Sequence, residues 1–273
     1  MRAQDDVNIT VAHYESGASR ATIEAALQCA GLDPGSLTAA DLAPLEDFHA
    51  MGRLATAALV AAVEAQPTDR VLDAGTGIGG TARHVASTVG CHVTAVDVTP
   101  AYCEIAHWLN RATGLDDRID VEQADVTDLP FADASFDIVF SQHVQMNIAD
   151  KAALYREARR VLRTGGRLAM WDVLAGPVAP LAFPVPWADG PEASWLVTPN
   201  ELRALLDEAG FETLAWQDRT ADVGALLPLM LAQGEQPLGL HVFVPDFTTK
   251  LRNFAVNAEQ DRLRLVQAVL EAR

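Results

Sequence analysis

Three carboxylates stand where a parallel sheet would bring them together. Asp73 ends the short apolar run 71–73, Asp97 stands near the end of the run 92–98, and Asp125 directly follows the run 119–124. If each run is a strand of one parallel sheet, the three side chains face a single crevice at the carboxyl ends of the strands. Carboxylates there can accept hydrogen bonds from an ammonium group, ribose hydroxyls or an adenine amino group, but they repel a phosphate. Taken singly, each is as easily a helix cap or a turn residue.

A glycine-rich turn follows Asp73 within residues 71–80, which read Val-Leu-Asp-Ala-Gly-Thr-Gly-Ile-Gly-Gly. Glycine lets the chain turn tightly and lets a ligand approach the backbone closely. The turn by itself fits an NAD(P) dinucleotide as well as S-adenosylmethionine. Asp73 discriminates between them, because a carboxylate before the first glycine opposes a pyrophosphate and favours the cationic amino-acid end of S-adenosylmethionine.

The elements that must position these residues begin at Arg70. From there, short apolar runs alternate with stretches of helical periodicity, which predicts right-handed βαβ units on a parallel sheet. The predicted strands are Val71–Asp73, His92–Val98, Ile119–Ala124, Phe136–Ser141 and Arg167–Val173, and the predicted helices are Thr81–Thr88, Ala101–Ala112 and Lys151–Leu162. A chain of 273 residues is long enough for one large α/β domain with insertions.

The flanking segments have different patterns. Residues 1–66 are rich in alanine and leucine at helical spacing, over about 18–31 and 45–66, and predict a helical N-terminal lid. Residues 67–273 then form the main domain, with a proline- and aromatic-rich insertion at 175–197 and an apolar insertion at 221–258 that prolines and glycine interrupt. Thr198, Pro199 and Glu201 have the spacing of a capping box that opens a helix ending at Gly210. Further strands are expected at 211–216 and 262–272.

Residues 68–173 resemble the core of the class I S-adenosylmethionine-dependent methyltransferases. Residues 71–80 resemble the first motif of that family, 93–98 the second and 123–140 the third, and Arg160-Val-Leu-Arg-Thr-Gly-Gly-Arg-Leu is similar to the segment before its fifth strand. The greatest similarity is to the ubiquinone/menaquinone-type and sarcosine/dimethylglycine-type small-molecule enzymes. The resemblance implies a Rossmann-like α/β fold, with a seven-stranded, mostly parallel sheet, helices on both faces and the last strand antiparallel.

The resemblance also implies S-adenosyl-L-methionine as the cofactor, S-adenosyl-L-homocysteine as the product, and a role for each matching residue. The implied cofactor-binding residues are Tyr14 in the lid, Asp73, Gly75, Thr76 and Gly77 around the methionine moiety, Asp97 at the ribose, Val98, Asp125 and Val126 around the adenine, and Ser141 and Gln142 at the reacting centre. Thr76 replaces a cysteine that is common in the family, and such variation leaves the assignment unchanged.

The acceptor half of the site is predicted around His143. Methyl transfer is an in-line displacement, so the protein mainly positions the two reactants, which can supply about 7–11 kcal/mol. A general base is needed only if the nucleophile arrives protonated, and His143, with an ordinary pKa of about 6.5, is the candidate. The alternative is that His143 packs in the cleft wall and orients the substrate by one hydrogen bond. His49, in the lid, is more typical of a surface histidine near a helix cap.

Gln145, Asn147, Phe183 and Trp187 are the candidate substrate-binding residues. Gln145 and Asn147 follow His143 and can bind a polar group of a substrate, although Asn147 fits equally well as a turn cap. Phe183 and Trp187 belong to the insertion at 175–197 and can form the apolar wall that small-molecule sites need. Their alternative is to pack that insertion onto the sheet.

Composition argues against several other classes of function. Lysine and arginine number 20 against 37 acidic residues, and a net charge of −17 disfavours nucleic acids and anionic membranes as partners. The cysteines, Cys29, Cys91 and Cys103, have no CxxC spacing, so we expect reduced thiols, no metal site and a cytoplasmic protein. The first residues show no signal-peptide pattern, and no apolar run reaches the roughly 20 residues of a membrane span. The apolar insertion at 221–258 is a candidate interface for a homo-oligomer.

The sequence therefore predicts an enzyme that transfers the methyl group of S-adenosylmethionine to an oxygen, nitrogen or carbon of a small-molecule metabolite. Two alternatives stay open. One is a protein that keeps this fold and binds the cofactor without methyl transfer, since fold does not fix function. The other is an NAD(P)-dependent oxidoreductase, against which Asp73 and Asp125 argue.

Overall fold

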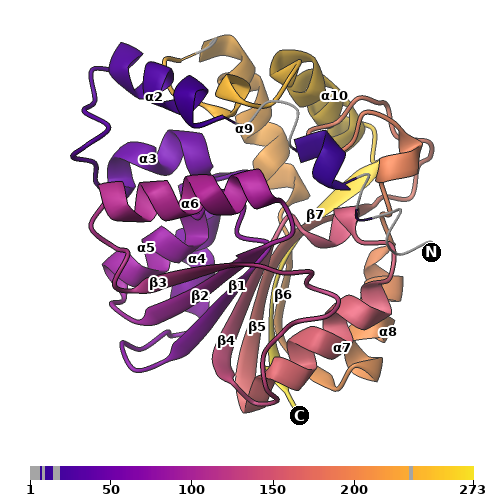
Figure 1. The fold of residues 1–273 in the computed structure, drawn as a ribbon. Helices are drawn as coiled ribbons and strands as arrows, with labels where there is room; N and C mark the ends of the chain where they lie inside the picture. The colour runs from indigo at the N-terminus through magenta and orange to yellow at the C-terminus, as the bar shows by residue number, and fades with distance from the viewer. Residues whose placement is uncertain (1–6, 8–9, 15–18, 234–235) are drawn as a thin grey trace.

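A seven-stranded sheet forms the centre of the computed structural model, which describes residues 7, 10–14, 19–233 and 236–273 (Figure 1). The strand order is β3-β2-β1-β4-β5-β7-β6. The strands are β1 (Arg70–Ala74), β2 (His92–Asp97), β3 (Ile119–Gln123), β4 (Phe136–Gln142), β5 (Leu162–Ala175), β6 (Phe211–Asp218) and β7 (Leu263–Ala272). Strands β1 to β5 pair in parallel, and β7 runs antiparallel to both β5 and β6. The predicted fold is confirmed, including its antiparallel last strand.

Helices cover both faces of the sheet and bury a separate apolar core on each. One core contains Leu59 of α4 (Arg53–Ala62) and Val85 of α5 (Gly80–Thr88), together with residues of α6 (Pro100–Ala112). The other lies under α7 (Lys151–Val161) and α8 (Pro199–Glu208). Successive strand residues serve opposite cores, as the period of two requires: Val71 belongs to the first and Leu72 to the second.

Most of the predicted boundaries in the sheet region lie within two residues of the observed ones, but β5 is longer than predicted. It begins at Leu162, directly after α7, rather than at Arg167. Leu162 pairs with Phe136 of β4, and the register shifts before Arg167 pairs with Ile138. The predicted start at Arg167 left Gly165 and Gly166 before the strand, whereas they form an irregular stretch inside it. The capping box at Thr198 and Glu201 is present as predicted.

The N-terminal segment is helical but more divided than the sequence predicted. Its described helices are α2 (Arg20–Cys29), α3 (Ala39–Glu46) and α4, and residues 10–14 are also helical. The helical stretch predicted over about 45–66 is wrong in its first part, because residues 47–52 are not helical. Met51 and Gly52 have left-handed backbone, with φ of 67° and 50°, so α4 begins only at Arg53. The unpredicted helix α3 begins at its own capping box, formed by Thr38 and Asp41.

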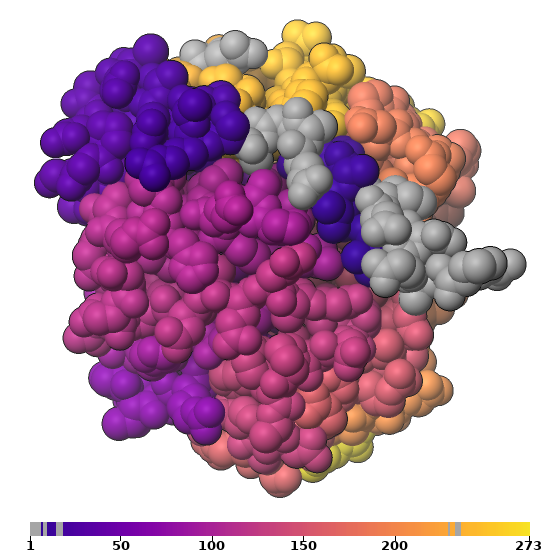
Figure 2. All heavy atoms as spheres, viewed as in Figure 1, coloured from indigo at the N-terminus to yellow at the C-terminus, as the bar shows by residue number. Residues whose placement is uncertain are grey.

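Helix α2 packs on the domain through a third apolar cluster. Ile23 and Leu27 of α2 are buried with Leu109 of α6 and with Phe243 from the segment before α10. In Figure 2 the indigo residues of α2 lie beside the magenta residues of α6 and the gold segment from the C-terminal part of the chain. The lid is therefore in contact with segments far from it in sequence. The division of the chain at residue 66 stays a prediction. Residues 1–6, 8–9 and 15–18 of the predicted lid lie outside the described part.

The two insertions support one another. The second contains α9 (Thr220–Gln233) and α10 (Phe247–Glu259), and Pro228 lies inside α9 instead of interrupting the segment. The side chain of Asn257 in α10 accepts a hydrogen bond from the Ala182 N–H and donates one to the Ala182 carbonyl, at 2.8 and 2.9 Å. Asn253 donates to the Pro184 carbonyl at 2.8 Å.

Among the described residues, no helix is both long and apolar enough to cross a membrane.

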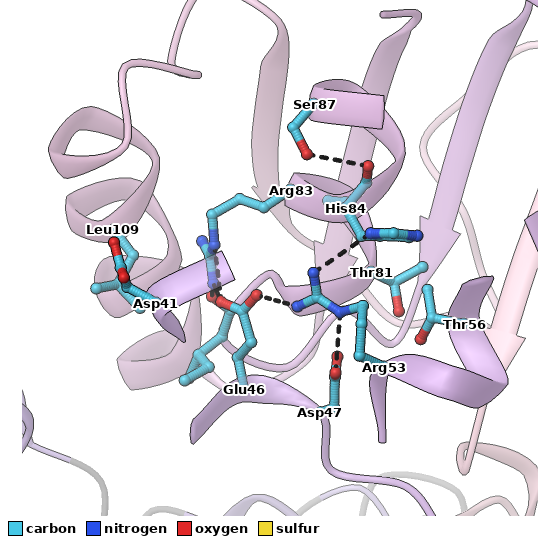
Figure 3. Close-up of polar contacts among 12 residues, drawn as sticks. Asp41, Glu46, Asp47, Arg53, Thr56, Thr81, Arg83, His84, Ser87 and Leu109 are labelled. Atoms are coloured by element: carbon cyan, nitrogen blue, oxygen red, sulfur yellow. Dashed lines mark hydrogen bonds and ion pairs between the residues drawn. The ribbon is translucent and has the colours of Figure 1, made fainter. Parts of the chain in front are cut away.

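A buried network of charges joins the lid to α5 (Figure 3). The guanidinium of Arg83 donates two hydrogen bonds to Oε2 of Glu46, at 2.6 and 2.9 Å, and one to Oδ1 of Asn110 at 2.7 Å. Oε1 of Glu46 accepts from Arg53 at 2.6 Å, and Arg53 also donates to Asp47 at 3.0 Å. The side chains of Arg83 and Glu46 are fully buried. Each charge therefore depends on its partner rather than on water.

Replacement of Arg83 by methionine tests this network. The change leaves the buried Glu46 carboxylate with one cationic partner instead of two, so we expect the free energy of unfolding to fall by about 3–5 kcal/mol. Arg163→Met is the matched control, since Arg163 pairs with Asp137 but its side chain is 53% exposed, and such a pair contributes about 0.2–1 kcal/mol. Urea unfolding measures both variants, and equal losses would contradict the structural role assigned to Arg83.

Candidate functional site

A cavity of about 590 Å³ lies at the carboxyl ends of β1 to β4. Its volume falls in the range of small-molecule sites, roughly 300–1,000 Å³. The turns after these strands form one side, and lid residues such as Phe48 and His49 form the other. The sequence-predicted residues that line it are Tyr14, Asp73, Gly75, Thr76, Gly77, Asp97, Val98, Asp125, Val126, Gln142, His143 and Asn147.

The turn after β1, residues 75–77, forms a glycine cradle, a concave stretch of backbone whose space a side chain at Gly75 would occupy. The N–H groups of Gly75 and Thr76 both donate to the carbonyl of Val96 in β2, at 2.9 and 2.8 Å. Gly75 and Gly77 have φ of 80° and 56°, in the left-handed region that glycine tolerates best. A Cβ atom on Gly75 would lie only 2.4 Å from a methyl carbon of Val144. The turn therefore needs glycine at position 75 both for its backbone and for the space beside Val144.

Asp73 and Asp97 fix this turn from two sides. Oδ2 of Asp73 accepts from the Thr76 hydroxyl at 2.6 Å and from the Ala82 N–H at 3.1 Å. Oδ2 of Asp97 accepts from the Gly77 N–H at 2.9 Å. Both carboxylates also line the cavity. The turn-residue and ligand-binding interpretations are thus compatible, because each group shapes the backbone and still faces the ligand space.

Burial raises the pKa of both carboxyls. The pKa of Asp73 rises to about 7, because loss of solvent outweighs the hydrogen bonds from Thr76 and Ala82, and the nearby charge of Asp97 adds to the effect. Burial likewise raises the pKa of Asp97 against the opposing backbone hydrogen bonds it accepts. Two acids of raised pKa in one cavity favour a cationic ligand, which would stabilise their charged forms.

The segment Asp-Val-Thr occurs twice in the wall, at 97–99 and 125–127. In each copy the aspartate accepts the N–H of the threonine two residues later, at 2.9 Å for Thr99 and 2.8 Å for Thr127. Oδ1 of Asp125 also accepts from the Thr127 hydroxyl at 2.7 Å. Sequence reasoning missed both threonines, although the repeated tripeptide after two neighbouring strands could have revealed them.

Aromatic residues from the lid and α6 close another part of the wall. The hydroxyl of Tyr14 accepts a hydrogen bond from the Asn147 side chain at 2.8 Å, and its ring centroid lies 5.9 Å from that of Tyr102. The Phe48 ring is 5.7 Å from Tyr102. Tyr102 and Phe48 carry no motif that would have revealed them. They reach the cavity only because the lid packs against α6.

His143 lies in the cavity wall near His49 of the lid. The two ring centroids are 6.0 Å apart, and the His143 ring is parallel to Trp171 at 6.5 Å. His143 has a φ of 53° and donates its backbone N–H to the Trp171 carbonyl at 2.7 Å. Its Nε2 is buried and has no hydrogen-bond partner within the described part of the chain. Burial, with a smaller effect of His49, holds the pKa of His143 well below 6.5.

His49 is buried in the lid rather than placed on the surface, so the surface-histidine expectation is wrong. Its side chain is 5% exposed, and its Nε2 is hydrogen-bonded to the Thr56 hydroxyl at 3.1 Å. Burial lowers the pKa of His49 to about 4. Gln142 lies beside this pair and donates to the hydroxyls of Thr56 at 3.3 Å and Thr81 at 2.7 Å.

Ser141 and Gln145, both predicted site residues, do not line the cavity. Ser141 is buried in β4 next to Gln142, and neighbouring strand residues point to opposite faces of the sheet. Gln145 is fully buried and donates to the Val173 carbonyl at 2.6 Å. A sequence pattern places such residues near the end of β4, but the direction of each side chain depends on the pleat and on the turn at His143.

Phe183 and Trp187 also lie away from the cavity. Trp187 is buried, donates its ring N–H to the Ser194 hydroxyl at 3.0 Å and meets Phe254 of α10 edge-on at 5.9 Å. Phe183 is half-buried against the same apolar core. For both residues the structure thus shows the alternative interpretation, in which they pack the insertion against the domain. The insertion at 175–197 is fastened to α10, which the sequence pattern of either segment alone did not reveal.

Residues 72–170 match the family model described as a methyltransferase domain. That range contains the glycine turn and the three carboxylates Asp73, Asp97 and Asp125.

The chain is also similar to particular methyltransferases. It is 35% identical over 154 residues to the sarcosine/dimethylglycine N-methyltransferase of Halorhodospira halochloris, a match that covers 56% of this chain and about half, 55%, of that enzyme. The predicted resemblance to that type is confirmed.

Two solved structures share the fold at lower identity. Geranyl diphosphate C-methyltransferase from Streptomyces coelicolor A3(2) superposes with a TM-score of 0.75 and 16% identity, covering 100% of both chains. The [4+2]-cyclase SpnF superposes with a TM-score of 0.64 and 23% identity, covering 79% of both chains. At these identities the likeness concerns the fold alone.

The raised pKa of Asp73 predicts how stability depends on pH. The ordinary value is 3.8 and the folded value about 7, so between these pH values the folded protein holds a proton that the unfolded chain has released. The contribution of Asp73 to the free energy of unfolding is therefore full below pH 4 and is lost as pH rises through 7, by up to about 1.4 kcal/mol per pH unit. Burial raises the pKa of Asp47 and Asp172 with the same sign.

Asp73→Asn should therefore reduce the fall in stability between pH 5 and 7, while Asp120→Asn, which replaces a side chain 66% exposed, should leave it unchanged. Urea unfolding of the ligand-free protein at the two pH values, about 5 and about 7, measures the slope. The assignment fails if the two variants and the original protein show the same slope.

Proposed function

We propose that this protein transfers the methyl group of S-adenosyl-L-methionine to an oxygen, nitrogen or carbon of a small-molecule metabolite, with S-adenosyl-L-homocysteine as the product. The observation that carries this proposal is the convergence of Asp73, Asp97 and Asp125 with the glycine cradle in one cavity. The methyltransferase domain at 72–170 supports the same function. Three carboxylates at this position oppose the pyrophosphate of an NAD(P) cofactor, so the oxidoreductase alternative is less well supported.

The residues present fit the parts of the cofactor. Asp73 would hold the cationic end of the methionine moiety, and the backbone at 75–77 would approach it closely. Asp97 would accept from the ribose hydroxyls, and Asp125 from the adenine amino group, with buried Val126 packed beside the ring. When bound, the cofactor supplies a methyl group already activated on a sulfonium. The protein then has to bring an acceptor into line with that methyl group.

His143 is the proposed catalytic residue of the acceptor half. Because its pKa is held well below 6.5, the imidazole is neutral at pH 7 and can accept a proton or a hydrogen bond from the acceptor. The same low pKa makes it a weak base, so most of the rate enhancement would come from positioning. The lid residues Tyr14, Phe48 and His49 would keep water from the reacting groups.

Cofactor binding is the first test. S-adenosylhomocysteine should raise the thermal midpoint of the protein, and NADH should not. Asp97→Ala should weaken binding of S-adenosylhomocysteine at least tenfold, or about 1.4 kcal/mol, because it removes the ribose acceptor and a support of the glycine turn. Asp120→Ala, on the exposed side of β3, is the control and should bind normally. Stabilisation by NADH but not by S-adenosylhomocysteine would overturn the proposal.

His143→Ala tests the acceptor half. The variant should lower methyl transfer about 10²–10⁴-fold if His143 takes the proton, and should leave the affinity for S-adenosylhomocysteine unchanged. Transfer of label from methyl-tritiated S-adenosylmethionine to the acceptor, together with calorimetric binding of S-adenosylhomocysteine, separates the two effects. Undiminished turnover would remove His143 from the mechanism.

A cofactor-binding protein without methyl transfer is the second candidate, since the fold is shared with a [4+2]-cyclase. Labelled-cofactor turnover distinguishes it from the first. We further propose a cytoplasmic protein, because its three cysteines have no CxxC spacing and are free thiols. Its net charge of −17 supports a protein that binds neither nucleic acid nor membrane. The insertion at 221–258 is the candidate surface for a homo-oligomer.

A further inference from the structure

The described part of the cavity wall carries carboxylates but no lysine or arginine. Its acidic members are Glu46, Asp73, Asp97, Asp125 and Asp150. Arg53 and Arg83 are close to Glu46, but both are paired with it, at 2.6 Å in each case, and neither lines the cavity. The fixed charges that face the ligand space are thus all negative.

The cofactor and the fold account for these carboxylates. Asp73, Asp97 and Asp125 belong to the half proposed for S-adenosylmethionine. That cofactor carries two positive groups, a sulfonium and an ammonium, and one carboxylate, so its net charge is positive. Glu46 is held by its two arginines, and Oδ1 of Asp150 accepts the N–H of Ala153 at 2.9 Å to cap α7. No cation in the described wall remains to neutralise an anionic acceptor.

The acceptor half consists of uncharged groups. His49 and His143 contribute two imidazoles whose ring centroids are 6.0 Å apart. Burial keeps the pKa of His49 at about 4 and that of His143 well below 6.5. A second charge on this pair would add repulsion to the cost of burial. Neutral imidazoles can exchange hydrogen bonds with a hydroxyl or an amine, but they cannot balance a phosphate or a carboxylate.

We infer that the acceptor carries no phosphate or carboxylate group, and that His49 and His143 together contact its reacting polar group. This inference rests on the proposed function and narrows its substrate class. It separates the chain from two of the proteins it resembles, whose names specify a diphosphate and amino acids as substrates. A shared fold permits this difference, because the substrate is chosen by side chains that line the acceptor half.

The charge of the methylated product tests the inference. The protein is incubated with methyl-tritiated S-adenosylmethionine and a deproteinised extract of cellular metabolites, and labelled products are passed over an anion exchanger at neutral pH. We expect the labelled product to pass through unretained. A retained product, and above all one released by phosphatase treatment, would overturn the inference. If S-adenosylhomocysteine binds but no labelled product forms, it is the proposed methyl transfer that fails.

A binding measurement decides the inference independently of turnover. Sodium pyrophosphate and geranyl diphosphate are titrated by calorimetry into the protein saturated with S-adenosylhomocysteine. We expect no saturable binding of either anion up to millimolar concentrations, and saturable binding of either would overturn the inference. His49→Gln and His143→Gln add no charge to the wall and should give the same result. Methylation of the acceptor should fall at least tenfold in each of these variants, while binding of S-adenosylhomocysteine stays unchanged.

Discussion

The buried ion pair between Arg83 and Glu46 is the contact on which the shape of the site depends. Arg83 lies one turn into α5, immediately after the glycine turn, and Glu46 ends α3 of the lid. The pair explains the last two glycines of the motif. A Cβ on Gly79 would lie 2.7 Å from an Arg83 nitrogen, and one on Gly80 would lie 2.9 Å from the Glu46 side chain and backbone. Gly80 leaves room for the lid and Gly79 for the guanidinium of Arg83, whereas Gly75 leaves room beside Val144 in the cavity wall.

The position of the lid follows from that pair. Glu46 is the last residue of α3, and Asp47 continues the network through Arg53 of α4. The chain between these helices passes over the cavity, which is why Phe48 and His49 line it. A buried ion pair gains little net stability compared with an apolar contact of the same shape, but it tolerates few alternative arrangements. Its role here is to fix one geometry of the lid over the strand ends.

The cavity is divided by chemistry. The turns after β1, β2 and β3 supply carboxylates and bare backbone. The lid, α6 and the turn at His143 supply aromatic rings, neutral imidazoles and the carboxylate of Glu46, which is paired with two arginines. Burial raises the pKa of the acids and lowers that of the histidines for the same reason, since each charged form loses its hydration. A cationic cofactor would stabilise the charged carboxylates and so lower the raised pKa of the acids. The lowered pKa of the histidines keeps both imidazoles neutral at pH 7.

The sequence alone determined the strand and helix order, the glycine turn and the carboxylates, because these are encoded locally. Hydrophobic alternation identifies each strand, and a residue that follows a parallel strand must lie at one edge of the sheet. Asp73, Asp97 and Asp125 could therefore be assigned to one cavity without coordinates. Only the tertiary structure decided the acceptor half. Phe48, His49 and Tyr102 reach the cavity through long-range packing. Trp187 lies away from the cavity because it packs against Phe254 of α10. Such contacts join segments far apart in the chain, and no local periodicity records them.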